Sequence, residues 1–428
     1  MTTVPALIKK NTLLLSGAQA FVGAGTQLTP TLGGIMIERL LGSMVLAGLG
    51  SSLLYFARLL IAYPIGWVSD AYGRKAGLLL GLALSFVGAV TVGFSMVWLS
   101  FPIFFVGLLV FGLGVGAGQQ LRTAAADMYL PDRRGEGLGY VLTGALVGAL
   151  GGPILIAAAQ AGAVPLRIDA TALAWLLVPA VLVPSAVLVL LIHPDPKTIA
   201  THLARFYPGY EPPLRDGATL AAGAGLRSWL AHHPIRVALA SMFAAHGIMV
   251  MMMALTPLSM SHGGHPLTMI SVAVSLHVVG MFGLSLPIGR MTDRFGRRAV
   301  IQLGLLITAG ATLLVPLASD YWVATAGLVL IGVGWSCVSV AATALVADTV
   351  PAVERGRAVG LLDSSSGVAS IVLPLAGGPL AEAYGFMALA VLAIAIVIGP
   401  MLLTARLQER VLERFVEVPA ELYAGPAD

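Results

Sequence analysis

The sequence predicts an all-α membrane protein in which twelve transmembrane helices form two pseudo-symmetric bundles of six. Three observations lead to this fold class. Hydrophobic residues make up 58% of the 428 residues and charged residues only 10%, whereas a soluble domain carries roughly 25% charged residues. The apolar residues gather in stretches of about 20, the length that crosses a bilayer, and motifs of the first half recur in the second. This composition excludes a soluble enzyme, a nucleic-acid-binding protein and a disordered regulator.

Each half of the chain contains six apolar stretches that are long enough to span the membrane. The predicted spans cover residues 12–36, 44–68, 77–97, 101–126, 137–162, 171–193, 236–259, 268–290, 299–318, 322–346, 358–381 and 386–404. The first stretch follows Lys9 and Lys10, as the apolar part of a signal peptide would. Its apolar character continues to Met36, however, so we interpret it as an uncleaved spanning helix.

The positions of the basic residues predict the orientation. Of the 24 Lys and Arg residues, 20 fall on the side of the membrane that holds the N-terminus. Only Arg39 and Arg167 fall on the other side, while Arg58 and Arg122 lie within spans. Because cytoplasmic loops carry an excess of Lys and Arg, we expect both termini to be cytoplasmic.

The chain between the sixth and seventh spans is polar and rich in proline, which predicts a cytoplasmic linker with a short surface helix at Thr198–Phe206. The segment Ala405–Phe415 alternates charged and apolar faces and is predicted to lie along the membrane surface. The predicted units are a first six-helix bundle at 1–193, the linker at 194–235, a second bundle at 236–404 and a cytoplasmic tail at 405–428.

The clearest internal repeat follows the second and the eighth spans. Residues 64–75 read PIGWVSDAYGRK and residues 287–298 read PIGRMTDRFGRR, with six identical positions and a seventh that is basic in both. Glycine permits a tight turn, while Asp and Arg can cap a helix end and hold neighbouring helices together. The motif residues are Gly66, Asp70, Gly73, Arg74 and Lys75, and Gly289, Asp293, Gly296, Arg297 and Arg298. Two parallel six-helix repeats are a transporter architecture.

The pattern G-x-x-x-D-x-x-G-R-[RK] between spans two and three resembles the signature loop of the major facilitator superfamily. It occurs twice at the expected places, and the resemblance covers the whole chain. The resemblance implies alternating access between two rocking bundles, gating roles for both loops, and a monomer. The fourth span departs from the R-x-x-Q-G-x-G run of many drug exporters, because no Arg precedes its glycines at positions 112, 114, 116 and 118. This departure argues against a drug–proton antiporter.

Methionine is concentrated in spans seven and eight, since nine of the 16 methionines fall between positions 242 and 291. Met249 and Met253 share one face of span seven, with His246 near the same stripe, and His277 and Met281 have the same i, i+4 spacing in span eight. Both pairs are expected near the bilayer midplane, where such transporters bind substrate. Thioethers and imidazole suit Cu(I), which prefers soft ligands.

The spacings M-x-x-x-M and H-x-x-x-M resemble the CcoA-like copper-importing branch of the superfamily. By that resemblance Met249, Met253, His277 and Met281 would bind copper as the substrate, in a bacterial inner membrane. Riboflavin importers are similar to the same branch overall. Two other interpretations stay open: the methionines fill gaps in the helix packing, or they contact another substrate. The loop Met260–His265 is either a flexible metal-capturing hairpin or a polar turn.

Three charged residues fall inside predicted spans, where a charged side chain is energetically unfavourable and is therefore expected to have a functional or structural role. Arg58 and Arg122 either bind an anionic solute or are paired gate residues. Asp363 either carries a coupling proton or accepts a hydrogen bond at a helix end.

The function predicted from these observations is secondary active transport, with the lipid bilayer and a small substrate as partners and no resident cofactor. Copper import is the first hypothesis. Import of riboflavin or another small organic solute, or proton-coupled drug efflux, is the alternative. A receptor or assembly factor would need a large soluble appendage, and an intramembrane enzyme a convincing catalytic set at depth. The sequence offers neither, so we expect no enzymatic activity.

Overall fold

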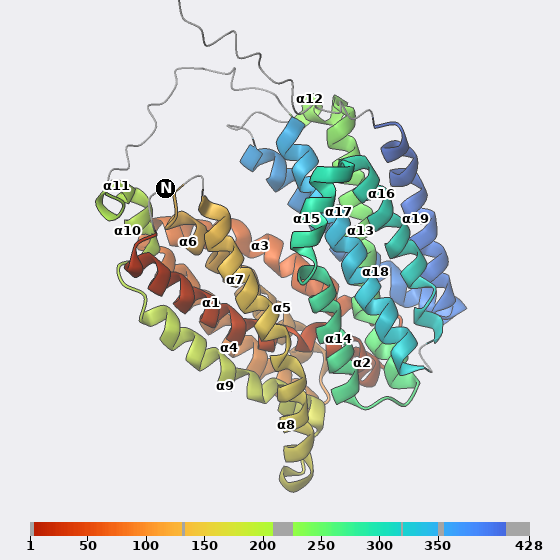
Figure 1. The fold of residues 1–428 in the computed structure, drawn as a ribbon. Coiled ribbons are helices and arrows are strands. Elements are labelled where there is room, and N and C mark those ends of the chain that lie inside the picture. The colour runs from red at the N-terminus through yellow and green to blue at the C-terminus, as the bar shows by residue number, and fades with distance from the viewer. Residues whose placement is uncertain (1–3, 131–132, 209–225, 318–319, 350–354, 408–428) are drawn as a thin grey trace, which may run out of the picture.

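The computed structural model describes residues 4–130, 133–208, 226–317, 320–349 and 355–407, and these residues are almost entirely helical (Figure 1). The first half of the chain forms α1 (Ala6–Thr26), α2 (Leu28–Leu41), α3 (Leu49–Tyr72), α4 (Arg74–Val97), α5 (Phe101–Gly118), α6 (Gln120–Asp127), α7 (Arg134–Ala149), α8 (Gly151–Leu166) and α9 (Ala170–Leu190). The connecting segment forms α10 (Pro196–Thr201), α11 (Leu203–Phe206) and α12 (Leu226–Ala231). The second half forms α13 (His233–His262), α14 (Leu267–Phe282), α15 (Ser285–Phe295), α16 (Arg297–Thr312), the short 3₁₀ turn η2 (Val315–Leu317), α17 (Tyr321–Thr349), α18 (Arg355–Tyr384) and α19 (Met387–Ala405).

Each of the twelve predicted spans is largely helical where the structure describes it, and ten of the helices described are long and apolar enough to cross a membrane. The predicted span 12–36 is divided between α1 and α2, and 299–318 contains the 16-residue α16 followed by η2. Several spans are interrupted at one residue, such as Gln27, Gln119 and Leu150. Each of these keeps right-handed helical dihedral angles, so the chain continues in nearly the same direction.

Of two predictions about the connecting segments, one needs revision and the other stays a prediction. The surface helix predicted at Thr198–Phe206 begins earlier, at Pro196, because the Asp195 side chain accepts a hydrogen bond from the Lys197 amide and caps the helix. It is then broken at His202, whose dihedral angles (φ −132°, ψ 40°) are not helical. The tail segment predicted to lie on the membrane surface falls outside the described residues from position 408 onward.

The two halves of the chain lie side by side, each around its own apolar core (Figure 1). Glycine allows close helix packing within each half. A Cβ atom on Gly116 of α5 would lie 2.9 Å from Arg58 Cα of α3, so the missing side chain lets α5 pack directly against the backbone that carries Arg58.

The halves touch where α2 packs on α13, α3 on α18 and α8 on α14. A Cβ on Gly48 would lie 1.7 Å from the Pro374 carbonyl oxygen, and one on Gly378 would lie 2.2 Å from that of Val45. We call this end of the bundle, which contains the α2–α3 and α18–α19 connections, the closed end. The other end carries the two repeated loops and most of the Lys and Arg residues, and we call it the basic end. At the basic end, α6, α10 and α15 pack within their own halves.

Candidate functional site

A cluster of polar and aromatic side chains joins the two halves near the middle of the bundle. The Arg58 guanidinium lies over the Tyr55 ring, 4.8 Å from the ring centre. Tyr55 in turn meets the His246 ring edge-on, with ring centres 5.8 Å apart. Arg58 lies 14 residues from the end of α3 at Tyr72, and His246 lies 13 residues from the start of α13 at His233. At about 1.5 Å per residue, both side chains lie about 20 Å from the basic end.

His246 is held by Trp335 of α17. The indole Nε1 donates a hydrogen bond of 2.7 Å to His246 Nδ1, and the two ring centres are 5.7 Å apart. Phe282 packs edge-on against the other side of the indole, with ring centres 5.9 Å apart. Because an indole N–H can only donate, Nδ1 is the acceptor and the proton of the neutral imidazole lies on Nε2. His246 thus belongs with Tyr55 and Trp335 instead of the methionine stripe predicted for it.

Arg122 and Asp363 form a second tier nearer the basic end. Arg122 of α6 is within electrostatic reach of Arg58, Tyr55 and Asp363. Asp363 is exposed on α18. Since Arg122 belongs to the first half and Asp363 to the second, the two charges attract each other across the region between the halves.

The two arginines lack ion-pair partners within the described part of the chain, although Arg58 lies over the Tyr55 ring and Arg122 is within electrostatic reach of Asp363. Among the described residues, neither Arg58 nor Arg122 takes part in an ion pair. The Nε atom of each is buried and makes no hydrogen bond. Two unpaired cations within a membrane span are unfavourable, at roughly 2.5–3.5 kcal/mol or more each. The arrangement therefore provides a site for acidic or carbonyl oxygens from outside the protein.

The structure assigns the methionines of the predicted methionine–histidine set to two apolar clusters. Met253 packs in a small cluster with Ala273 and Leu328, and His277 is bonded through Nδ1 to the Leu328 carbonyl oxygen at 2.5 Å. Met249 lies instead in the main core of the second half, and Met281 packs at its edge. All four side chains are wholly or partly buried.

His277 has the tautomer opposite to that of His246. The Leu328 carbonyl can only accept, so Nδ1 carries the proton and Nε2 bears a lone pair in the neutral ring. That Nε2 atom is buried and has no hydrogen-bond partner. No group of three or more His, Cys, Asp or Glu side chains suited to a metal occurs in the part of the chain that the structure describes.

The predicted outer loop is not a flexible Met/His hairpin. Helix α13 continues to His262, so Met260 is inside the helix and fully buried. The His262 ring is bonded through Nε2 to the Glu38 carboxylate at 2.9 Å, and His265 packs against the Tyr321 ring. Both histidines are therefore engaged at the closed end.

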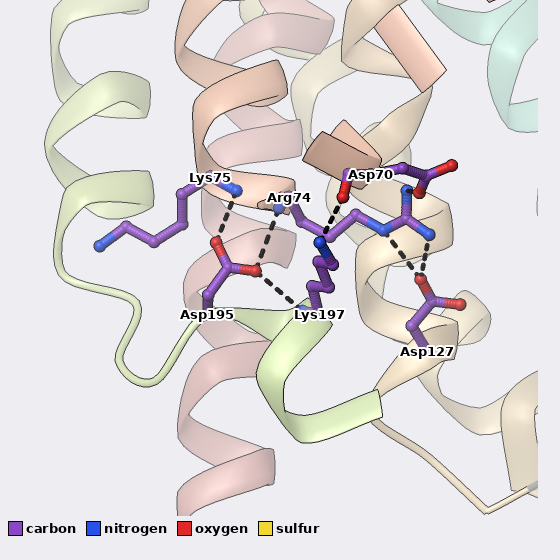
Figure 2. A network of polar contacts seen from close by, with 6 residues as sticks. All are labelled: Asp70, Arg74, Lys75, Asp127, Asp195 and Lys197. Carbon is purple, nitrogen blue, oxygen red and sulfur yellow. Dashed lines mark hydrogen bonds and ion pairs between the residues drawn. The ribbon is translucent and has the colours of Figure 1, made fainter. Parts of the chain in front are cut away.

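The first repeated loop forms a network of charges at the basic end (Figure 2). The turn needs Gly73, whose φ of +99° is in the left-handed region that favours glycine. Arg74 donates from Nε to Asp127 at 2.9 Å and from Nη1 to Asp70 at 3.2 Å. Lys75 donates from Nζ to the carbonyl oxygen of Leu190, the last residue of α9, at 2.9 Å and to that of Ile192 at 2.8 Å.

Asp195 completes this network, and the sequence analysis did not single it out. Its carboxylate accepts the main-chain N–H groups of Arg74 and Lys75, each at 3.0 Å, and thereby caps the N-terminus of α4 (Figure 2). Lys197, on the same short helix, donates to the Asp70 carbonyl oxygen. The sequence does contain one sign of this role, because Asp195 is followed by a proline, and such a pair commonly begins a helix. The pair predicts that Asp195 caps α10, but it does not predict that Asp195 also caps α4.

The second loop repeats the arrangement. Arg297 pairs through Nε with Asp348 at 2.8 Å and through Nη2 with Asp293 at 3.6 Å. Arg298 donates to the Leu407 carbonyl oxygen after α19, as Lys75 does after α9. Gly296 has φ +89°, matching Gly73. Gly66 and Gly289 both have open space where a Cβ would lie.

Comparisons with known proteins agree with this architecture. A family model described as Major Facilitator Superfamily matches residues 12–263 and 237–422. The chain is 28% identical over 360 residues to the uncharacterized MFS-type transporter YddS of Bacillus subtilis (strain 168), covering 83% of this chain and 81% of that protein. It is 26% identical over 355 residues to the riboflavin transporter RfnT of Brucella anthropi, covering 83% and 85%.

Solved structures show the same fold. A bacterial homologue of the human lysosomal transporter Spinster, in an inward-facing and occupied conformation, superposes with a TM-score of 0.71 at 14% sequence identity. The match covers 92% of this chain and 94% of that one.

Proposed function

We propose, from the premise that the chain belongs to the Major Facilitator Superfamily and is a multi-pass secondary transporter, that its substrate is a small organic solute whose acidic or carbonyl oxygens bind Arg58 and Arg122. The observation that carries this proposal is the pair of guanidinium groups in the middle of the bundle that make no ion pair with a described residue and whose buried Nε atoms make no hydrogen bond. A guanidinium binds carboxylate, phosphate and carbonyl oxygens through several N–H donors in a fixed plane. The 26% identity with a riboflavin transporter supports an organic solute as the class.

The transport cycle follows from the arrangement of the halves. We place the basic end and both termini in the cytoplasm of a bacterium, because the Lys and Arg residues are concentrated there. The closed end then faces outward, and the site near Arg58 lies between the closed end and the cytoplasmic basic end. Rocking would move the two halves apart at the closed end and bring them together at the basic end. In this proposal a monomer carries out the whole cycle. In this proposal Asp363, which is within electrostatic reach of Arg122 of the other half, would take up a coupling proton.

An uptake experiment tests the organic solute against the metal. Cells that express the wild type, Arg58→Gln, Arg122→Gln or the double variant Met249→Leu/Met253→Leu at equal membrane abundance are given radioactive riboflavin or radioactive copper. We expect riboflavin uptake above the empty-vector control that falls at least tenfold in either arginine variant and persists in the methionine variant. Riboflavin uptake that is insensitive to both arginine variants would contradict the proposal.

Copper import is the second candidate, and one observation favours it. The lone pair on His277 Nε2 is buried without a partner, in the same packing region as the Met253 thioether. Imidazole and thioether together suit Cu(I). In the experiment above, copper uptake that is lost in the methionine variant and retained in the arginine variants would establish this candidate in place of the first.

A further inference from the structure

We propose that the site selects planar aromatic solutes, with Tyr55 and Trp335 as the ring-binding surfaces and His246 Nε2–H as a hydrogen-bond donor to the solute. This inference rests on the proposed function, in which Arg58 and Arg122 bind the solute's oxygens. It adds a second requirement, because the arginines by themselves would accept aliphatic and aromatic solutes equally.

The donor role of His246 follows from its tautomer. Trp335 Nε1 donates to Nδ1 at 2.7 Å, which leaves the ring proton on Nε2. Nε2 makes no hydrogen bond with a described residue and keeps some exposed surface. The imidazole is half-buried at the junction of the two halves. An accessible N–H therefore lies at the same depth as the Arg58 guanidinium.

The aromatic surfaces come from opposite halves of the molecule. Tyr55 of α3 meets the His246 ring at 89°, and Trp335 of α17 meets it at 58°, with both ring centres within 5.8 Å of it. Tyr55 and Trp335 are half-buried, so part of each ring remains uncovered. Aromatic rings favour offset-stacked and edge-to-face contacts with other aromatic rings, each worth about 0.5–1.5 kcal/mol beyond burial. A planar solute would contact both halves at once.

The geometry also assigns Trp335 a positioning role toward His246. Phenylalanine at position 335 would keep an aromatic surface but remove the one donor to Nδ1 among the residues that the structure describes. The imidazole could then place its proton on either nitrogen. Leucine at the same position would remove the ring as well. The two substitutions thus separate the hydrogen bond from the stacking surface.

The test compares two probes that share a phosphorylated polyol and differ in one aromatic ring system. Riboflavin 5′-phosphate carries the tricyclic ring, and ribitol 5-phosphate lacks it. Binding of both is measured by calorimetry on the full-length protein in lipid nanodiscs, for the wild type, Tyr55→Leu, Trp335→Leu, Trp335→Phe, His246→Leu and Arg58→Gln. Size-exclusion profiles confirm that each variant is folded, and the affinity of each variant for ribitol 5-phosphate is the reference against which its preference for the ring is calculated.

We expect the wild type to bind riboflavin 5′-phosphate at least tenfold more tightly than ribitol 5-phosphate. Leucine at position 55, 246 or 335 should reduce that preference about three- to tenfold, and Trp335→Phe should have a smaller effect. Arg58→Gln should weaken both probes. Equal affinity for the two probes, or a preference that survives the three leucine variants, overturns the inference but leaves the proposed function standing if Arg58→Gln weakens both. Binding of neither probe, or binding indifferent to Arg58→Gln, overturns both.

Discussion

The two glycines of the first repeated loop, Gly66 and Gly73, differ in how well they tolerate substitution, although both belong to the motif. A Cβ on Gly73 would lie 2.7 Å from the Asp195 carboxylate, at a φ that favours glycine, whereas Gly66 has open space around it. We expect Gly73→Ala to destabilise the protein by about 1–3 kcal/mol and Gly66→Ala by less than about 1 kcal/mol. Thermal unfolding of the two purified variants in the same detergent measures the difference, and equal melting temperatures would contradict it.

Single residues of the candidate site could be predicted only where the chain itself carries the signal. Arg58, Arg122 and Asp363 stand out because a charge within an apolar stretch is visible in the sequence. Tyr55 and Trp335 do not stand out, because aromatic residues are ordinary in transmembrane helices. Their importance depends on which helix of the other half meets them, and that is a property of the fold.

At the scale of a helix, Asp169 shows how the start of α9 is fixed. Its carboxylate accepts hydrogen bonds from the Thr171 amide at 2.9 Å and the Ala172 amide at 3.3 Å, and it pairs with Arg39. Burial by itself would raise the pKa of Asp169, but the hydrogen bonds from Thr171 and the Arg39 guanidinium outweigh burial and lower it.

This pKa shift predicts a pH dependence. A carboxyl group with a lowered folded-state pKa stabilises the protein above its unfolded pKa of about 3.9, and that contribution disappears as the pH falls through the folded value. Asn is an equally good cap but carries no charge. We therefore expect Asp169→Asn to be about 0.3–1 kcal/mol less stable than the wild type at pH 7, with the gap closing below about pH 4. Melting temperatures across this range provide the measurement, and a gap that widens toward acid would refute the assignment.

The short helix α10 joins the connecting segment to the first half through one carboxylate. Asp195 caps both α10 and α4, so its loss removes three hydrogen bonds at once. We predict that Asp195→Ala lowers stability by about 1–3 kcal/mol and makes the 194–208 segment more sensitive to trypsin at Lys197. Thr198→Ala, one residue beyond Lys197 on α10, is the control, because its side chain donates none of these hydrogen bonds. Identical digestion rates for the two variants would exclude the capping role.

The elements themselves were more predictable than their details. Apolar runs of about 20 residues define spans regardless of their neighbours, because the bilayer requires them. The interruptions at Gln27, Gln119 and Leu150 carry no Pro or Gly signal at the residue itself, and the dihedral angles there stay helical. Such small changes are set by packing against adjacent helices, which local sequence does not encode.

For the whole molecule, the internal repeat predicts two similar bundles but not how they are tilted against each other. Alternating access requires one sequence to support at least two arrangements of the same helices. The arrangement seen here is held at the closed end by contacts between the halves. These include Ser43 to Glu382 at 2.7 Å, Ser52 to the Ile371 carbonyl oxygen at 2.7 Å, and His262 to Glu38 at 2.9 Å.

Two adjacent residues of α2 allow a direct test of this closure. Glu38 bonds His262 across the two halves, whereas Arg39 pairs with Asp169 within the first half. Glu38→Ala removes an interaction that exists only while the halves meet at the closed end. We therefore expect the population of molecules in which this end is open to rise about two- to tenfold, which corresponds to the net free energy of one hydrogen bond. Arg39→Ala removes a charge at the same end without a cross-half partner, so it should leave the populations unchanged.

Spin labels can report the populations directly. Trp98 and Trp322 are 63% and 72% exposed at the closed ends of α4 and α17, one in each half, and Cys337 is the only cysteine to be replaced. Pulsed dipolar spectroscopy on Trp98→Cys/Trp322→Cys/Cys337→Ala in nanodiscs should show a longer-distance population that grows with Glu38→Ala and not with Arg39→Ala. Equal distance distributions in both variants would mean that the Glu38–His262 contact does not hold the halves together. A shift of the same size in Glu38→Ala and Arg39→Ala would mean that removing any charge at the closed end opens it, whether or not that charge has a partner in the other half.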